Sequence, residues 1–336
     1  MLLKRIKNNL LVFRRLVCLP KFVYSFLEGG IYQYNEPCTL LYNAKCKREA
    51  SSLLENLFEK KHSNNNYLRK LFALLYRKHV NEEKCFFKGS LLLMTSSGHE
   101  FKVFNFTNKE ILTIFDDGEK CERVYKNREV WSKSFKTVKF DIYKDKNAIV
   151  EKMLNRVPCD STKCFSQLIE DYGNYLPKAK HISVASYAQD DLLHYCKAIG
   201  RESDFKKLYD YIHGDEFVSC IVHGDLWYSN VMMTENGMYY LDFENICPRI
   251  FYYDLFFFIV GDFVFRKNAF LLNAFRNGFY DNDFCALFKA VGVEYNHDMK
   301  TLYIETVFFL LYLEKWKNTE LESNVKLVTI VLNEFN

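Results

Sequence analysis

Hydrophobic positions change their spacing twice along the chain. From 51 to 80 the apolar residues recur at steps of three and four, which is the period of amphipathic helices. From 86 to 154 short apolar runs alternate with polar turns, which predicts strands, and after Pro158 the pattern becomes mostly helical. The sequence therefore predicts an α+β chain in three parts: a helical extension at 1–85, a sheet-bearing part at 86–154 and a helical part at 155–336.

The middle part is expected to contain a small sheet interrupted by one helix. The helix is predicted at 118–135, because Val124, Val130, Trp131 and Phe135 follow workable helical spacing among alternating charges. The remaining apolar runs predict strands at 90–94, 101–106, 111–115, 138–143 and 148–153. The helical part is predicted to hold a short pair of strands, at 219–222 and 238–241.

Composition and charge exclude several classes of protein. Hydrophobic residues make up 49% of the chain and charged residues 26%, which is typical of a folded protein. The 46 basic and 42 acidic residues leave a net charge of +4, which is too balanced for a protein that coats nucleic acid. No apolar run reaches the roughly 18 residues of a membrane span. The runs at 255–260 and 306–313 are therefore predicted to be buried helices.

The 11 cysteines form neither a CxxC pair nor a zinc-like spacing. The nearest neighbours are Cys38 with Cys46 and Cys159 with Cys164. They do not match the framework of a compact secreted domain either, so we expect reduced thiols in a cytoplasmic protein.

The first 26 residues combine basic and apolar side chains, without the cleavage site of a signal peptide. Two alternatives fit this segment. It is predicted either to pack as a helix on its own domain or to make weak contact with an anionic membrane surface.

Candidate chemistry is concentrated between His223 and Glu244. The segment His223-Gly-Asp-Leu-Trp-Tyr-Ser-Asn230 follows an apolar strand, and Asp242 ends the next predicted strand. Phosphoryl transfer needs one carboxylate that orients the attacking hydroxyl and accepts its proton. It also needs an amide oxygen and a second carboxylate that hold magnesium on the phosphates. Asp225, Asn230 and Asp242 can fill these roles in that order.

The same residues resemble the signature of the aminoglycoside phosphotransferase and choline kinase superfamily. The shared pattern is His-Gly-Asp-x-x-x-x-Asn, followed by Asp242-Phe-Glu244 and by Asp254. The resemblance implies a two-lobed protein-kinase-like fold, with a small antiparallel sheet in a nucleotide-binding N-lobe at 86–154 and a mostly helical catalytic C-lobe at 155–336. It also implies ATP and Mg²⁺ as cofactors and a small molecule or sugar as the hydroxyl acceptor.

The resemblance further implies a role for each motif residue. These roles are catalytic base for Asp225, metal ligand for Asn230 and Asp242, support of the catalytic loop for His223 and Asp254, and an additional contact for Glu244.

The N-lobe carries a weaker pattern. The turn at Thr95-Ser96-Ser97-Gly98 could offer backbone N–H groups and hydroxyls to phosphate, although any hairpin could have this sequence. The third strand lacks the lysine that kinases place there, paired with a helix glutamate. The candidates that remain open are Lys102, Lys109 and Lys120, with Glu129 favoured over Glu122 as the partner. Glu151 and Met153 lie in a segment that resembles the hinge, where backbone groups would meet adenine.

A second copy of the tripeptide serves as a comparison within the chain. His213-Gly-Asp215 lies ten residues upstream, but position 220 is Cys, so no metal-binding amide follows it. Because a short motif without its structural context is often a false match, we interpret His213 and Asp215 as ordinary loop residues.

Two other functions remain open at this stage. A protein kinase would carry Arg in place of Gly224, Lys in place of Trp227 and an Ala-Pro-Glu segment, none of which is present. A non-catalytic scaffold is favoured by the missing strand lysine, whereas the retention of Asp225, Asn230 and Asp242 argues against it.

The acceptor is predicted by analogy as a hydroxyl of a sugar or amino alcohol, such as the precursor of a surface glycan or lipid head group. Five aromatic residues near the motif could face such a molecule or could pack in the core. They are Trp227, Tyr228, Phe251, Tyr252 and Tyr253.

Overall fold

The computed structural model describes residues 21–34, 40–57, 77–95, 100–182, 187–214, 217–316 and 321–335. The chain divides into two compact units. The first unit comprises Met1–Lys126 and Val138–Leu154, and the second comprises Asn127–Thr137 and Asn155–Asn336. The predicted α+β fold is confirmed, because the first unit is built on an antiparallel sheet and the second is mostly helical.

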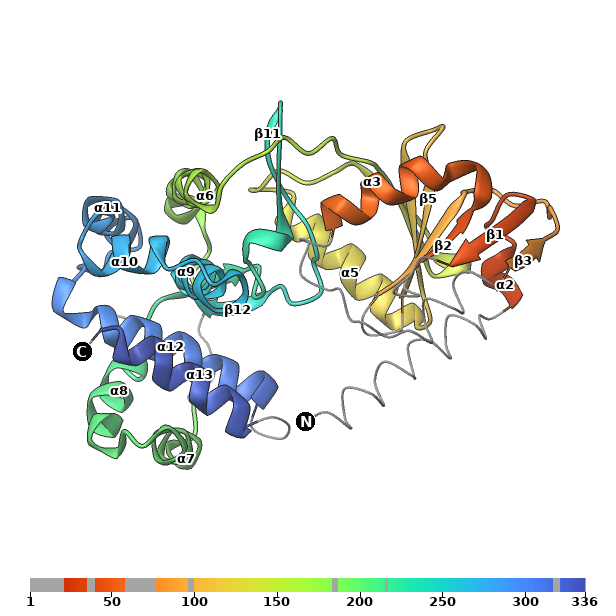
Figure 1. Cartoon of the computed structure of the whole chain (residues 1–336). Coiled ribbons are helices and arrows are strands. Elements are labelled where there is room, and N and C mark those ends of the chain that lie inside the picture. The colour runs from red at the N-terminus through yellow and green to blue at the C-terminus, as the bar shows by residue number, and fades with distance from the viewer. Residues whose placement is uncertain are drawn as a thin grey trace. The chain divides into compact units, whose positions relative to one another are not determined.

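Within the described part of the first unit, eight strands form one antiparallel sheet in the order β3-β1-β2-β4-β5-β6-β8-β7 (Figure 1). The sheet is therefore larger than the small sheet that the sequence predicted. Its strands are β1 (Gly30–Tyr34), β2 (Leu40–Asn43), β3 (Arg77–Val80), β4 (Leu91–Met94), β5 (Glu100–Asn105), β6 (Glu110–Phe115), β7 (Phe140–Tyr143) and β8 (Ala148–Lys152).

The additional strands come from the segment that was predicted as a helical extension at 1–85. Strands β1, β2 and β3 belong to this sheet, with Leu41 opposite Leu92 where β2 pairs with β4. Tyr32, Tyr34 and Leu41 are buried in the same cluster as Val103, so burial against the sheet decides the structure of this segment. The helical pattern at 58–76 and the basic residues at 1–20 lie outside the described residues.

Helices of the first unit cover one face of the sheet. Ala50 of α3 (Lys47–Leu57) packs in a cluster with Leu91 and Phe104. Cys121 and Val124 of α5 (Gly118–Trp131) pack with Phe115 and Ile149. The short helix α2 (Lys21–Tyr24) contributes Val23 to the cluster on the opposite face. Lys102 lies on the face covered by α3 and α5. It is two residues from Phe104 along β5, and residues two apart in a strand point to the same face.

The second unit is a group of helices around α9 (Tyr253–Arg266). Eleven of the fourteen residues of α9 are buried, which confirms that the apolar run at 255–260 is a core helix. Helices α6, α10 and α12 pack against it (Figure 1). Besides α9, the described α-helices that lie wholly within this unit are α6 (Ser161–Tyr175), α7 (Gln189–Ile199), α8 (Phe205–Ile212), α10 (Phe270–Arg276), α11 (Asp281–Ala290), α12 (Lys300–Leu311) and α13 (Leu321–Asn333).

Two short antiparallel strand pairs correct the predicted strand pair of this unit. Strand β9 (Ser219–Val222) pairs with β12 (Cys247–Ile250), whereas β11 (Gly237–Tyr240) pairs with β10 (Val231–Thr234). The predicted strands exist, but they do not pair with each other. The reason is local: a two-residue turn at Glu235 and Asn236 folds β11 directly back on β10.

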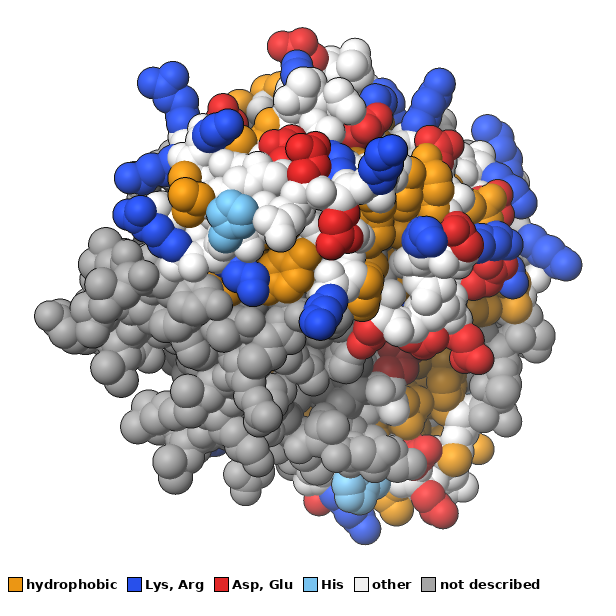
Figure 2. All heavy atoms as spheres, turned by 90° about the vertical axis from the view of Figure 1, so that its right-hand side faces the viewer, with side chains coloured by type: hydrophobic (Ala, Val, Ile, Leu, Met, Phe, Trp, Pro, Cys, Tyr) orange, Lys and Arg blue, Asp and Glu red, His pale blue; other side chains and the backbone are white. Residues whose placement is uncertain are grey.

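Among the described residues, no helix is both long and apolar enough to cross a membrane. The face in Figure 2 carries basic and acidic side chains interspersed with hydrophobic ones. This mixture of signs follows from the nearly balanced charge of the whole chain.

Candidate functional site

The carboxylate of Asp254 shapes the loop that carries the motif. Asp254 lies in the first turn of α9 and is fully buried. Its Oδ2 accepts the backbone N–H of His223 at 2.6 Å, and its Oδ1 accepts the N–H of Gly224 at 2.9 Å. The hydroxyl of Tyr172, from α6, also donates to Oδ2. A buried carboxylate needs several donors, and here two of them are consecutive amides of the motif, so the course of the loop is set by Asp254.

Asn230 folds back onto Asp225. The amide Nδ2 of Asn230 donates to the backbone carbonyl of Asp225 at 2.7 Å and lies 3.3 Å from its Oδ2. The backbone N–H of Asn230 donates to the carbonyl of Trp227 at 2.9 Å, which closes the short turn Tyr228–Asn230. With its nitrogen committed to the loop, the carboxamide presents its oxygen on the other side of the group.

Leu241 joins the two segments of the motif. Its backbone N–H donates to the carbonyl of Asn230 at 2.9 Å, and its carbonyl lies 2.9 Å from Nε2 of His223. The next residue, Asp242, is exposed and has a left-handed backbone with φ of 66°. Such a conformation is uncommon for a residue other than glycine and concentrates at functional positions. The residue before Asp242 is thus bonded to the loop of Asp225 through both its N–H and its carbonyl.

His223 is fully buried, and burial lowers the pKa of its imidazole, although Asp254 and Asp242 act in the opposite direction. The ring is therefore neutral at physiological pH. Because its Nε2 faces the Leu241 carbonyl, Nε2 carries the hydrogen and donates it. The ring also meets the edge of Trp131 at a centroid distance of 5.4 Å. These contacts hold the imidazole in one orientation beside the loop.

Arg249 is a part of the site that the sequence did not reveal. Its guanidinium is buried and donates to the carbonyl of Gly224 at 2.7 Å. It also forms a two-point contact with Glu314, in which Nε donates at 2.7 Å, and it lies 4.4 Å above the ring of Tyr253. Gly224 has φ of 80°, and a Cβ there would lie 2.3 Å from the Asn245 carbonyl oxygen. Only glycine fits this turn.

The motif offers oxygen atoms, and oxygen is the ligand type that magnesium takes. Within the described ranges, no group of three or more His, Cys, Asp and Glu side chains could hold a metal. Magnesium is commonly bound by only one or two carboxylates together with substrate phosphates. The carboxylate of Asp242 and the carboxamide oxygen of Asn230 are hard donors of this kind.

The candidate nucleotide residues of the first unit are partly described. Lys102 on β5 lies opposite Thr113 of β6, and both are at least half-buried. Glu151, on β8, and Met153, directly after it, follow Ile149 at steps of two residues. They therefore lie on the same face of the sheet as Lys102. Met153 also donates its backbone N–H to the Lys109 carbonyl at 2.8 Å. The predicted phosphate turn, at Ser96, Ser97 and Gly98, lies outside the described residues.

The ion pair between strand and helix in this unit has the reverse polarity of the expected one. Lys120 of α5 contacts Glu100 of β5 at 2.5 Å, and both side chains are largely buried. The acidic partner is therefore on the strand and the basic partner on the helix. Glu129, the predicted helix partner of Lys102, is exposed and belongs to the second unit, so that pairing stays a prediction.

The remaining predicted residues divide between loops and core. Phe251, Tyr252 and Tyr253 are fully buried, whereas Trp227 and Tyr228 are half-buried. The core therefore takes three of the five aromatic candidates for acceptor contact. The carbonyl of half-buried Glu244 is 3.4 Å from the Asn127 amide. His213 follows helix α8, where its ring nitrogens face two backbone carbonyls, and Asp215 is outside the described residues.

Comparisons with known proteins were made for sequence and for structure. No protein-family model and no curated protein matches the chain. Among solved structures, the chain is similar to the choline kinase LicA from Streptococcus pneumoniae, with 15% identity, a TM-score of 0.46, and coverage of 82% of this chain and 100% of that one. It is also similar to a choline/ethanolamine kinase family protein from Mesorhizobium loti, with 11% identity, a TM-score of 0.44 and coverage of 70% and 85%.

A third similar structure is an aminoglycoside phosphotransferase from Streptomyces rimosus, with 10% identity, a TM-score of 0.39 and coverage of 64% and 90%.

Proposed function

We propose that this protein is an ATP- and magnesium-dependent phosphotransferase that moves the γ-phosphate to a hydroxyl of a small molecule. The observation that carries the proposal is the backbone of Leu241, which bonds to Asn230 through its N–H and to His223 through its carbonyl. It brings the segment of Asp242 to the loop that holds Asp225 and Asn230. The segment of Asp242 and the loop of Asp225 and Asn230 are thereby joined by hydrogen bonds of the Leu241 backbone.

In this mechanism Asp225 orients the acceptor hydroxyl and takes its proton as the oxygen attacks phosphorus. Its side chain is half-buried, and the Asn230 amide lies 3.3 Å from one of its oxygens. That contact limits the directions in which the carboxylate can point. Positioning of this kind supplies much of the rate in phosphoryl transfer, where the protein has little covalent work to do.

The carboxamide oxygen of Asn230 and the carboxylate of Asp242 would hold magnesium. When bound, the ion neutralises negative charge on the phosphates. The remaining work belongs to the chain, and it consists of keeping both oxygens fixed. The buried side chains of Asp254 and Arg249 support the start of the loop, through the N–H groups of His223 and Gly224 and through the Gly224 carbonyl.

On the nucleotide side, Lys102 is proposed to contact the phosphates and the segment of Glu151 and Met153 to meet the adenine. The support is that these residues lie on one face of the sheet. The roles of Ser96, Ser97, Gly98 and Glu129 are proposed from the sequence alone.

The acceptor is proposed to be a hydroxyl on a sugar or an amino alcohol. Of the five aromatic candidates, Trp227 and Tyr228 are not fully buried, and an aromatic face can pack on a sugar ring or a cationic amine. A precursor of a surface glycan or of a lipid head group has this chemistry.

A substitution of Asp242 tests the mechanism. Turnover of the Asp242→Ala variant is expected to fall by at least about 10³, which is the scale of losing a strong electrostatic stabiliser. Asp215→Ala is the matched control, because Asp215 stands in the same His-Gly-Asp tripeptide without the downstream amide. Retained turnover in Asp242→Ala, or an equal loss in both variants, would contradict the assignment.

Binding experiments separate an enzyme from a scaffold. ATP with magnesium is expected to raise the thermal unfolding midpoint of the wild-type protein more than ATP alone. The additional shift is expected to disappear in Asp242→Ala. A protein without any response to ATP would be a scaffold. Acceptors can then be identified with radiolabelled ATP, where labelling of Ser, Thr or Tyr in a protein would indicate a protein kinase.

A further inference from the structure

Cys159 and Cys164 lie on either side of the start of helix α6. Asp160 caps the helix, and its Oδ1 accepts the backbone N–H of Lys163 at 2.8 Å. The residue before a cap and the fourth helical residue commonly pack together at a helix start, in the contact called a hydrophobic staple. In this helix those two positions are occupied by Cys159 and Cys164. The local fold therefore brings two thiols together.

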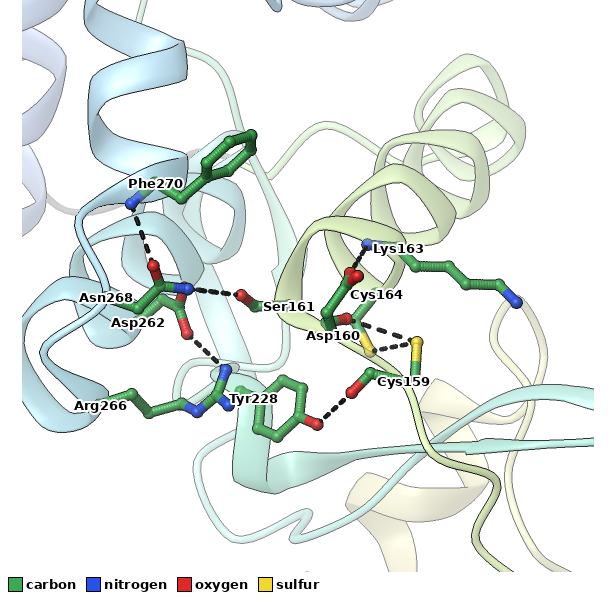
Figure 3. A network of polar contacts seen from close by, with 10 residues as sticks. All are labelled: Cys159, Asp160, Ser161, Lys163, Cys164, Tyr228, Asp262, Arg266, Asn268 and Phe270. Carbon is green, nitrogen blue, oxygen red and sulfur yellow. Dashed lines mark hydrogen bonds and ion pairs between the residues drawn. The ribbon is translucent and has the colours of Figure 1, made fainter.

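The two sulfurs are 3.6 Å apart, and both cysteines are free thiols (Figure 3). Cys159 is half-buried, whereas Cys164 is buried, at 2% exposure. A disulfide has an S–S length of about 2.05 Å. The sulfurs therefore need to approach by roughly 1.5 Å to bond.

The thiol pair is joined to the catalytic loop. The hydroxyl of Tyr228, which lies between Asp225 and Asn230 in the sequence, donates to the carbonyl of Cys159 at 2.5 Å. The guanidinium of Arg266 lies 3.8 Å from the centre of the Tyr228 ring. Figure 3 shows this connection from the cysteines through Tyr228 to Arg266.

A second connection leads from the same helix start to α9. The hydroxyl of Ser161, the first residue of α6, donates to the buried carboxylate of Asp262 at 2.7 Å. Asp262 also pairs with Arg266 at 2.8 Å and accepts the Asn268 amide at 2.8 Å (Figure 3). A displacement at the start of α6 thus reaches Tyr228 by two routes. One is the Cys159 carbonyl, and the other runs from Ser161 through Asp262 and Arg266.

We propose that Cys159 and Cys164 form an oxidation site, in which a small-molecule disulfide converts the two thiols into a disulfide that loosens the Tyr228 anchor of the catalytic loop. The pair is not part of the phosphotransferase mechanism. It adds a redox-dependent modification next to that loop.

The reaction proceeds by thiol–disulfide exchange. The half-exposed thiol of Cys159 loses its proton to water, attacks one sulfur of the oxidant and releases one thiol. The sulfur of Cys164 then gives up its proton and attacks Cys159, which forms the new S–S bond and releases the second thiol. Two protein thiols are oxidised and one small disulfide is reduced to two thiols. Burial raises the pKa of Cys164 to about 12, so its attack is the slow step and accelerates with pH.

Peptide mapping tests the disulfide directly. Trypsin cleaves after Lys163, an exposed residue between the two cysteines, and so separates Cys159 in peptide 157–163 from Cys164 in peptide 164–178. After treatment of the folded protein with oxidised glutathione, these two peptides are expected mainly as one linked pair, lighter by two hydrogens than the sum. The pair should disappear on reduction and in Cys159→Ser, and persist in Cys285→Ser, which removes an exposed thiol elsewhere.

Hydrogen exchange tests the coupling to the loop. Backbone amides in the segment 224–232 are expected to exchange faster in the oxidised protein than in the reduced one, and to recover after reduction. If Cys159 carries only glutathione, or if the linked pair forms only after unfolding in urea, the disulfide site is wrong. If the link forms and exchange in 224–232 is unchanged, the coupling is wrong. Neither measurement requires the activity proposed above.

Discussion

The carboxylate of Asp254 accepts the backbone N–H of His223 at 2.6 Å, so the first residue of the proposed catalytic loop is fixed to the first turn of a buried helix. The neighbouring N–H of Gly224 is 2.9 Å from the other oxygen of the same carboxylate. The position of the loop thus depends on a side chain that is fully buried.

Replacement of Asp254 by Asn is expected to displace the loop. The amide group of Asn presents N–H where one acceptor oxygen was, and a buried N–H without a partner costs about 1–3 kcal/mol of stability. A displacement of about 1 Å at a catalytic group lowers turnover by roughly 10². We therefore expect both a lower unfolding free energy, measured with denaturant, and lower turnover. Asp283→Asn, at an exposed position in the first turn of α11, is the control and should change neither.

Gly224→Ala is expected to lower the free energy of unfolding far more than Gly292→Ala, although both glycines have φ of 80°. The left-handed backbone alone costs an alanine about 1 kcal/mol. At Gly292 nothing lies within 4 Å of the added Cβ, whereas at Gly224 the Cβ would overlap the Asn245 carbonyl and the Arg249 guanidinium. We expect a loss of about 3 kcal/mol or more at Gly224. Equal unfolding midpoints for the two variants would show that the close approach is not rigid.

The buried Glu305 on α12 makes stability depend on pH. Burial and the charge of Asp204 raise the pKa of Glu305 to about 7, from an ordinary value of 4.5, against the influence of Arg201 and Lys207. The folded state therefore binds more protons than the unfolded state between these values. The contribution of Glu305 to the stability of the fold is complete below about pH 4.5 and is lost as the pH rises through about 7.

Glu305→Gln is expected to remove that dependence. From pH 5 to pH 8 the unfolding midpoint of the variant should rise relative to that of the wild type. The rise is about 2–4 °C for each kcal/mol of difference in unfolding free energy. The lowered pKa of His223 acts in the opposite direction, because stability falls as the unfolded imidazole is protonated near pH 6.5. Comparison of the two proteins cancels that effect. Glu294→Gln, at an exposed site, should follow the wild type, and parallel curves for all three would refute a raised pKa.

Lys102 and Lys120 are expected to fail in different ways. Lys120→Ala removes the ammonium group that contacts the largely buried Glu100, which we expect to cost about 3 kcal/mol of stability. Lys102→Ala is expected to cost less than about 1 kcal/mol. In return it should weaken ATP binding about tenfold, as the loss of 1.4 kcal/mol would do. Calorimetric titration with ATP, next to denaturant unfolding, distinguishes the two lysines. Weaker ATP binding in Lys120→Ala at full stability would reverse the assignment.

The parts of the fold that could be predicted are those decided by local sequence. Strands β5 and β6 were predicted to within one residue at each end, because apolar runs end at polar turns on both sides. The strands β1 and β2 could not be found in this way. Their place in the sheet depends on contacts such as Leu41 opposite Leu92, about fifty residues away along the chain.

The site shows the same division. The spacing between His223 and Asn230 was enough to predict the loop, because the pattern is contained in eight residues. Arg249 and Glu314 could not be assigned, since they are 65 residues apart and a buried arginine looks like any surface arginine in a sequence. The reversed ion pair of Lys120 and Glu100 was missed because only the register of β5 brings the glutamate under α5.

The T-shaped contact between Trp131 and His223 has a practical consequence. The sequence contains three tryptophans, and two of them, Trp131 and Trp227, lie against or within the loop that bears Asp225. Indole emission is sensitive to nearby polar groups and to solvent. The intrinsic fluorescence of this protein is therefore a label-free optical reporter of the loop, already built into the chain.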